Sequence, residues 1–182
     1  MAGRLAGMAV PWWVAGGWAL DLWRGEQTRP HHDIEICTPR ATWSAVRERL
    51  AGHDLWCAGA GRLTPLPAGA PAPADRRQVW VYDPGADAWR LDVMLDPADA
   101  TTWVCHRDGR VRRPLAEAVG TTADGIPYLR PEIVLLLKAR HRRPKDEADM
   151  AGCLPSLDAA SRAWLAGALA ALEPDSPWRA CV

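Results

Sequence analysis

The sequence has no phenylalanine, only two tyrosines, and no excess of charge of either sign. Its 22 Lys and Arg residues balance 22 Asp and Glu residues, so the formal net charge is zero. A neutral chain gives no electrostatic basis for bulk binding to nucleic acid or to anionic lipid, and we expect neither as a partner. Apolar runs such as Ile133–Leu137 are far shorter than the roughly 20 residues that cross a bilayer. We therefore expect no membrane span.

The five cysteines form no CxxC pair and no even-numbered disulfide framework. The N-terminus shows no continuous apolar segment with a cleavage site, so we expect a cytoplasmic protein with reduced thiols. The cysteines should then pack as small hydrophobic residues. With 48% hydrophobic and 24% charged residues among 182, the composition is that of a globular protein and excludes global disorder.

The first part of the chain alternates short strand and helix signals. In order, they predict a strand at 11–15, a Gly16-Gly17 break, a helix at 18–24 that Gly25 ends, a strand around 34–36, and a helix that Thr38-Pro39 opens and Gly52 ends. Further strands are predicted at 54–58, 62–66, 78–82, 90–95 and 102–106, with a Pro- and Ala-rich surface loop at 65–73 and a hairpin turn at Asp108-Gly109.

After about residue 120 the pattern becomes helical. Pro131 opens a helix that is apolar on all sides and should be buried, and two more helices are expected near 145–153 and 157–172. We predict an α+β fold. Residues 1–118 form a mixed sheet with flanking helices, and residues 119–182 form a C-terminal helical part and tail.

The triplet Asp33-Ile34-Glu35 is the most informative for chemistry. On a strand its two acids project from the same face, while Ile34 and Ile36 face the core. Carboxylates on one side repel each other unless a cation lies between them, and oxygen ligands suit Mg²⁺. A bare DxE pattern is also common on solvated sheet faces. The context, that is the neighbouring residues, must therefore decide between a metal site and a solvated face.

That context is a strand, two glycines and a helix. Glycines let a backbone approach phosphate closely, and a helix N-terminus offers free N–H groups and positive potential to an anion. Asp92 is a lone acid in the apolar strand 89–95. Together, Asp33, Glu35 and Asp92 would form a three-acid, two-cation site suited to in-line phosphoryl displacement. The alternative for Asp92 is a strand whose second face is solvated.

Gly16-Gly17-Trp18-Ala19-Leu20, then Thr28-Arg29-Pro30-His31-His32-Asp33-Ile34-Glu35, resembles the antibiotic nucleotidyltransferases of the DNA polymerase beta superfamily. The nearest resemblance is to the aminoglycoside 2''-O-adenylyltransferase-like group. It covers residues 12–36 closely and extends to Asp92. The segment from Tyr128 to Asp149 also resembles bacterial relatives.

The resemblance implies Mg²⁺, with two ions expected, and a nucleoside triphosphate, with ATP the first candidate. It implies transfer of a nucleoside monophosphate to a hydroxyl of a small acceptor. By position, Asp33 and Glu35 would hold metal, Asp92 would be the third ligand and general base, and Gly16, Gly17 and Trp18 would form the phosphate-binding turn. Glu35 replaces a more common Asp, and Trp18 replaces a phosphate-contacting serine.

Two nearby residues, Arg29 and Lys138, have two interpretations each. Arg29 either holds phosphate or fixes the acidic strand through an ion pair. Lys138 either contacts the triphosphate or makes a structural pairing. His31 is expected to be a hydrogen-bonding support, because Mg²⁺ prefers oxygen ligands. Asp21 is expected on the surface or in a cap, and Lys145 in a surface helical turn.

The acceptor cannot be read from the sequence. An aminoglycoside is the first candidate; a lincosamide, a metabolite, a protein side chain as in toxin–antitoxin systems, or a non-catalytic nucleotide-binding module are the alternatives. A polycationic drug needs an acidic subsite. The acids that could supply one are Asp83, Asp87, Asp96, Asp99 and Glu132.

Overall fold

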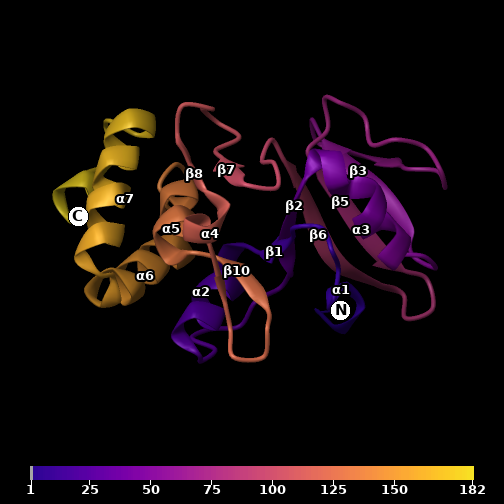
Figure 1. Ribbon diagram of the computed structural model, residues 1–182, viewed down its shortest axis with the longest axis horizontal. Helices are drawn as coiled ribbons and strands as arrows, with labels where there is room; N and C mark the ends of the chain where they lie inside the picture. The colour runs from indigo at the N-terminus through magenta and orange to yellow at the C-terminus, as the bar shows by residue number, and fades with distance from the viewer. Residues whose placement is uncertain (1) are drawn as a thin grey trace.

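A mixed sheet of eight strands, in the order β4-β3-β5-β6-β2-β1-β10-β9, forms the centre of the protein (Figure 1). We describe it from a computed structural model covering residues 2–182. The β2–β6 and β1–β10 pairs are parallel, and the other neighbours are antiparallel. This mixed sheet with flanking helices confirms the predicted α+β class.

The main sheet contains β1 Trp13–Val14, β2 Glu35–Pro39, β3 Asp54–Gly59, β4 Arg62–Pro65, β5 Gln78–Asp83, β6 Ala88–Asp96, β9 Val119–Thr121 and β10 Pro127–Leu129. A separate hairpin joins β7 Thr102–Val104 to β8 Arg112–Pro114, with the predicted Asp108-Gly109 turn between them. The helices are α1 Ala2–Leu5, α2 Gly16–Arg24, α3 Trp43–Arg49, α4 Leu115–Ala118, α5 Pro131–Lys138, α6 Pro144–Cys153 and α7 Ala159–Leu172. Short 3₁₀ turns lie at Arg40–Thr42, Leu154–Ser156 and Pro177–Ala180.

The helix start predicted at Thr38-Pro39 is wrong. Both residues end strand β2, and the fully buried Thr38 hydroxyl donates to the Pro11 carbonyl at 2.8 Å instead of capping a helix. Helix α3 begins only at Trp43. The glycine pair is also not a break before α2, because Gly16 is the first residue of that helix.

The sheet continues beyond residue 118, where only helices were expected. Strands β9 and β10 join it because β10 pairs in parallel with β1, Tyr128 opposite Val14. Strands this short carry too little alternation to be detected in a sequence. The helical part therefore begins at Pro131 rather than at residue 119, and the division of the chain into two domains stays a prediction.

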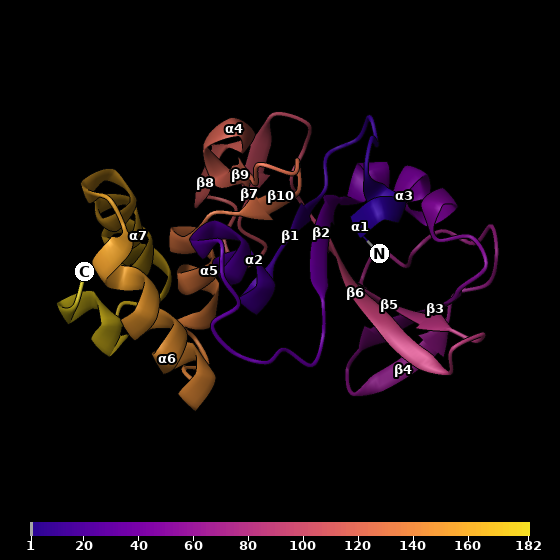
Figure 2. The same ribbon diagram turned by 90° about the horizontal axis from the view of Figure 1, so that it is seen from below.

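Two apolar clusters hold the molecule together. In the first, α1 and α3 pack on one side of strands β2, β6, β5 and β3, as Figure 2 shows. In the second, α2, α6 and α7 pack around Trp13 and helix α5. Helix α5 is buried, as predicted. Four of the five cysteines are buried and unpaired, as expected. Within residues 2–182, no helix has the length and apolar character of a membrane span.

The loop at 65–73 is fastened to the first cluster. Leu66 is buried, and the Arg47 guanidinium donates to the carbonyls of Pro67 and Ala70. This loop therefore covers α3 and leaves the opposite side of the sheet open, which is the side that carries the acids described next.

Candidate active site

Glu35 and Asp92 are direct neighbours on the parallel strands β2 and β6. The backbone N–H of Asp92 donates to the Ile34 carbonyl at 2.9 Å, which fixes this register. Residues in register point to the same face of a sheet, so the two carboxylates lie side by side. Asp33 lies two residues before Glu35, and its charge raises the pKa of both acids. The structure thus places Glu35 and Asp92 side by side, with Asp33 near enough to influence both electrostatically.

Burial is the largest influence on the pKa values of Glu35 and Asp92. Burial, reinforced by the Glu35 charge, raises the pKa of Asp92 to about 7. The pKa of Glu35 is raised by burial and then by Asp33. Gln78 donates to Asp92 Oδ2 at 2.9 Å, whereas the buried Oδ1 has no hydrogen-bond partner among residues 2–182. Buried acceptors are nearly always paired, so Oδ1 lacks a partner that a cation would supply.

These side chains therefore fit a divalent cation chemically. They offer oxygen donors only, as Mg²⁺ prefers, and they repel one another when ionised. As they stand, no three His, Cys, Asp or Glu side chains in the described part of the chain are close enough to hold a metal ion. The ligand set Asp33, Glu35 and Asp92 stays a prediction.

The glycine pair lies directly against this site. A Cβ on Gly16 would come within 1.9 Å of Glu35 Oε2, and Gly16 has a φ of +62°. A Cβ on Gly17 would come within 2.5 Å of the Arg29 guanidinium. Only glycine lets the start of α2 approach the acids this closely. Trp18, the third residue of the predicted phosphate turn, stacks on His31 with ring centroids 4.7 Å apart.

A pocket of about 450 Å³ opens between the glycine turn and the helical part. Asp33 and Glu35 line it on one side, and Arg29, Lys138, Arg143 and Lys145 line it on another. Arg143 and Lys145 are surface-exposed basic residues next to two acids. This arrangement suits a polyphosphate with bound cations. Lys145, expected on the surface alone, was missed as a pocket residue because α6 comes from a distant part of the chain.

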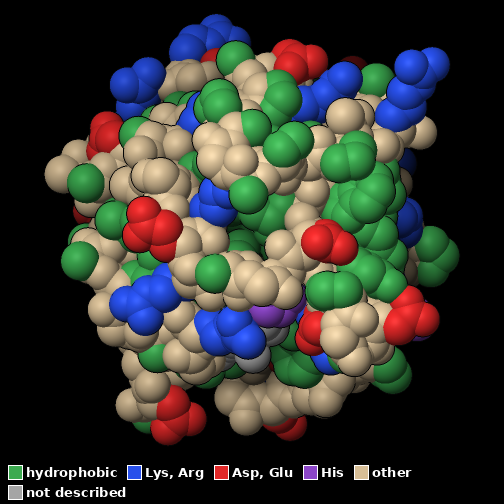
Figure 3. All heavy atoms as spheres, turned by 90° about the vertical axis from the view of Figure 1, so that its right-hand side faces the viewer, with side chains coloured by type: hydrophobic (Ala, Val, Ile, Leu, Met, Phe, Trp, Pro, Cys, Tyr) green, Lys and Arg blue, Asp and Glu red, His purple; other side chains and the backbone are tan. Residues whose placement is uncertain are grey.

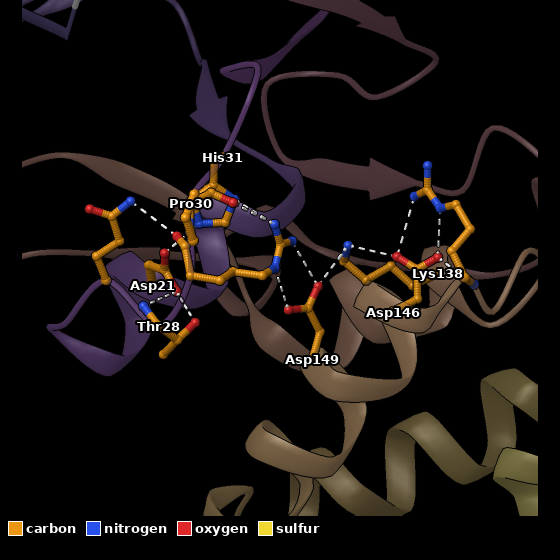
Figure 4. A network of polar contacts seen from close by, with 10 residues as sticks. Asp21, Thr28, Pro30, His31, Lys138, Asp146 and Asp149 are labelled. Carbon is orange, nitrogen blue, oxygen red and sulfur yellow. Dashed lines mark hydrogen bonds and ion pairs between the residues drawn. The ribbon is translucent and has the colours of Figure 1, made fainter.

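A chain of polar contacts connects the loop before β2 to α6, 120 residues away in the sequence (Figure 4). Arg29 binds Asp149 through two hydrogen bonds of 3.0 Å, and Lys138 lies 3.0 Å from both Asp146 and Asp149. Arg29 therefore makes an ion pair, but with α6 and not with the acidic strand. The structural pairing of Lys138 is likewise observed.

The electrostatics of this network are those of stabilised ion pairs. Burial opposes ionisation of Asp146, but hydrogen bonds from Arg143 and Lys138 lower its pKa to about 2. Burial similarly opposes ionisation of Asp149, and Arg29 and Lys138 lower its pKa. Both carboxylates are thus charged at neutral pH and hold the loop and the helices in one arrangement.

His31 continues the network into α2, as the support it was expected to be. Its Nε2 lies 2.5 Å from Asp21 Oδ2, and its Nδ1 lies 3.0 Å from the Arg29 guanidinium. Arginine can only donate, so Nδ1 accepts and the proton resides on Nε2. Asp21 was expected on the surface or in a cap, but it is buried and also binds Thr28. Its burial is a tertiary effect, since the loop folds back over α2.

A second pocket, of about 550 Å³, lies on the other side of Asp33. Asp33 and Asp92 line it together with three tryptophans, Trp18, Trp80 and Trp89. Trp80 and Trp89 were not predicted as site residues. The alternation around Trp80 could have indicated which face it occupies, but nothing local placed it beside Asp92.

None of the five acids proposed for a polycation subsite is free in this pocket. Asp83 pairs with Arg90, and Asp87 accepts from the Tyr82 hydroxyl. Asp99 is bound within its own loop to Thr101 and Thr102. The remaining two, Asp96 and Glu132, are buried beside Arg77 and Arg113. On the face shown in Figure 3, acidic and basic side chains are intermixed. The expected acidic subsite is not assembled.

Known proteins are similar in sequence to the first part of this chain. The model of the family described as Aminoglycoside-2''-adenylyltransferase matches residues 1–58. The chain is 39% identical over 49 residues to a 2''-aminoglycoside nucleotidyltransferase of Escherichia coli, and 40% over 47 residues to one of Klebsiella pneumoniae. These matches span 25% and 24% of this chain, and only 28% and 27% of the relatives. The expected resemblance is confirmed for the segment that carries Gly16, Asp33 and Glu35.

Solved structures extend the similarity to the whole chain. ANT(2'')-Ia in complex with adenylyl-2''-tobramycin has a TM-score of 0.57 at 15% identity, covering 93% of this chain and 92% of that one. The lincosamide antibiotic adenylyltransferase LnuA, with lincomycin bound, has a TM-score of 0.54 at 18% identity, covering 82% and 89%. The fold is that of the antibiotic nucleotidyltransferases. At these identities the likeness concerns the fold. Strands β5 and β6, which carry the second pocket, lie outside residues 1–58, the segment that the family model matches.

Proposed function

We propose that the protein is a Mg²⁺-dependent nucleotidyltransferase that moves a nucleoside monophosphate, from ATP as the first candidate, to a hydroxyl of a small acceptor. One observation carries this proposal. Asp33 lies between a pocket lined with basic residues and a second pocket that contains Asp92, and the register-paired Glu35 joins the two. A donor phosphate and an acceptor hydroxyl would thus meet at one set of acids. The relatives similar in sequence and fold, which act on antibiotics, support the same reaction class.

The chain's residues divide the work by position. The free N–H groups at the start of α2, together with Lys145, would hold the triphosphate in the basic pocket. Arg143, which is paired with Asp146, would add positive potential there. Lys138 and Arg29 border this pocket but are engaged with Asp149, so they would set its shape and potential more than grip the ligand. Trp18 would support the turn by stacking on His31.

Asp33, Glu35 and Asp92 would hold the cation, which supplies neutralisation of the triphosphate charge. Asp92 then accepts the proton of the acceptor hydroxyl. The hydroxyl oxygen forms a bond to the α-phosphorus while the bond to the bridging oxygen breaks, and pyrophosphate leaves. Catalysis of this kind depends on positioning and on charge neutralisation more than on covalent chemistry by the protein.

Thermal shift with ATP or GTP, with and without Mg²⁺, tests the donor half of the proposal. Stabilisation is expected only when nucleotide and Mg²⁺ are both present, and it should vanish in Asp33→Asn. The exposed loop variant Asp75→Asn is the matched control and should behave as wild type. The absence of any shift would overturn the proposal.

Pyrophosphate release over aminoglycosides, lincosamides and plain hydroxylated metabolites tests the transfer itself. We expect acceptor-dependent release from at least one class. Nucleotide binding without release from any acceptor would instead favour a non-catalytic nucleotide-binding module.

A further inference from the structure

The carboxylate pair continues across the sheet as a row of aromatic side chains. Asp92 is paired with Trp80 on β5, and Trp80 is paired with Trp56 on β3. Directly opposed residues share a face, so both tryptophans lie on the same side as Glu35 and Asp92. The alternate residues of these strands, such as Val79 and Val93, are buried under α3 on the other side.

A β-bulge adds a third tryptophan to this face. Val81 of β5 is opposite Leu91 of β6, and the next residue, Tyr82, is opposite Trp89 of β6. Arg90, which lies between Trp89 and Leu91, is therefore the extra residue on β6. Without the bulge, alternation from Asp92 would point Trp89 to the other side. The shift re-aims it toward the open face, which is a common use of bulges near binding sites.

Trp89 is the centre of the resulting cluster. Its ring centroid lies 5.1 Å from Tyr82, 5.5 Å from Trp80 and 6.4 Å from Trp56, with edge-to-face geometry. We call these four residues the aromatic platform. Trp89 is 48% exposed, although a large apolar side chain is usually covered. The buried Trp80 indole N–H has no partner among the described residues. The platform thus presents apolar area at its surface through the exposed Trp89.

Charge decides which ligand the platform suits. Its pocket contains two carboxylates, Asp33 and Asp92, and the proposed function commits both of them to the cation. Arg90 also lines the pocket, but its guanidinium is paired with Asp83 and supplies no free charge of either sign. A ligand with several positive charges would find no uncommitted acid here, whereas aromatic faces favour the apolar face of a ring. The pocket volume of about 550 Å³ lies in the range of sites for drug-sized molecules.

We propose that the aromatic platform is the acceptor site, and that it takes a hydroxylated ring with one apolar face and at most one positive charge. The ring would lie against Trp89, whose plane is nearly perpendicular to that of Trp80, with a hydroxyl directed toward Asp92. The proposal rests on the proposed nucleotidyl transfer and specifies its acceptor, which the N-terminal sequence match does not reach.

Isothermal titration calorimetry without nucleotide tests this independently of turnover. The probes are lincomycin, a neutral aryl glycoside and the polycation tobramycin. Wild type should bind at least one of the first two, and more tightly than tobramycin. Trp89→Ala should weaken that binding about tenfold or more, whereas Trp89→Phe, which keeps a ring, should retain most of it. Leu63→Ala removes the other exposed large apolar side chain and serves as the matched control, expected to bind as wild type.

Tighter binding of tobramycin, unchanged binding in Trp89→Ala, or binding of none of the probes would overturn the proposal. The Mg²⁺–ATP thermal shift of the same variants separates the two levels. If wild type shows no Mg²⁺–ATP thermal shift, the proposed nucleotidyltransferase function is refuted. A different outcome would refute only this inference: wild type shows the shift, Trp89→Ala abolishes it, and acceptor binding is unchanged. The platform would then be assigned to the nucleotide base.

Discussion

Glu35 and Asp92 face each other directly across the parallel strands β2 and β6, both largely buried on one side of the sheet. Two buried carboxylates in register oppose each other's ionisation and weaken the fold. This is the expected cost of a site that is arranged for a cation and not for the stability of the empty protein.

Asp92→Asn should separate stability from activity. Removing one buried charge should raise the free energy of unfolding at pH 8, without Mg²⁺, by about 1–3 kcal/mol. Pyrophosphate release should fall at least about 100-fold, because the proposed base is lost. Urea unfolding and the release assay measure the two effects. Asp54→Asn, an exposed acid on β3, is the control; a variant that is inactive and also less stable would contradict this reading.

Gly16→Ala and Gly25→Ala separate backbone strain from steric intrusion. Both glycines have positive φ, +62° and +76°, so each alanine should cost about 1–2 kcal/mol in unfolding free energy. Only at Gly16 would the new Cβ displace the Glu35 carboxylate, since nothing lies within 4 Å of one on Gly25. Gly16→Ala should therefore lose the Mg²⁺–ATP thermal shift, while Gly25→Ala keeps it. Equal shifts in both variants would remove Gly16 from the site.

The Arg29–Asp149 contact should be energetically coupled. Its two hydrogen bonds are partly buried, so a double-mutant cycle with alanine should give a coupling of about 1.5–3 kcal/mol. Arg29→Lys should restore only part of it, because an ammonium cannot make the paired contact. The same cycle on the more exposed Arg24–Glu26 pair, at 3.9 Å, should give less than about 1 kcal/mol. A coupling near zero for Arg29 would mean that the network does not hold the loop.

Asp96 should give a pH dependence to stability. Burial raises its pKa from 3.8 to about 6, despite the nearby Arg77. The folded protein therefore holds this proton more tightly than the unfolded chain, so stability falls as pH rises from about 4 to 6 and stays lower above that. The difference is on the order of 3 kcal/mol.

Asp96→Asn should remove this loss and raise the free energy of unfolding at pH 8, with little change near pH 4. Denaturant unfolding between pH 4 and 8 measures it, with Asp75→Asn as the exposed control. Lower stability of Asp96→Asn than of wild type at pH 8 would show that the Arg77 pairing outweighs the burial of the charge.

Local sequence was sufficient to predict α5, α6, α7, the strands that become β3, β5 and β6, and the glycine turn beside an acidic strand. Each has a signal of its own: a proline start, a residue alternation, or a glycine, which adopts positive-φ conformations that other residues rarely adopt. Thr38-Pro39 misled because a helix cap and a strand end use the same residues. Contacts with distant segments select the strand: Thr38 binds Pro11, 27 positions away, and pairs with Leu95 of β6.

The three acids could be selected from the sequence because Asp33, Glu35 and Asp92 break apolar strand patterns, each within a few residues. Their pairing in register could not, since it depends on which strands become neighbours. The same holds for the Arg29–Asp149 contact and for the bulge that turns Trp89 toward Asp92. The alternation of side chains along a strand is determined by neighbouring residues in the sequence. Strand order, register and long-range ion pairs arise only when distant segments pack together. The chain's sequence thus determined which chemical groups are available, and its tertiary structure decided which of them meet.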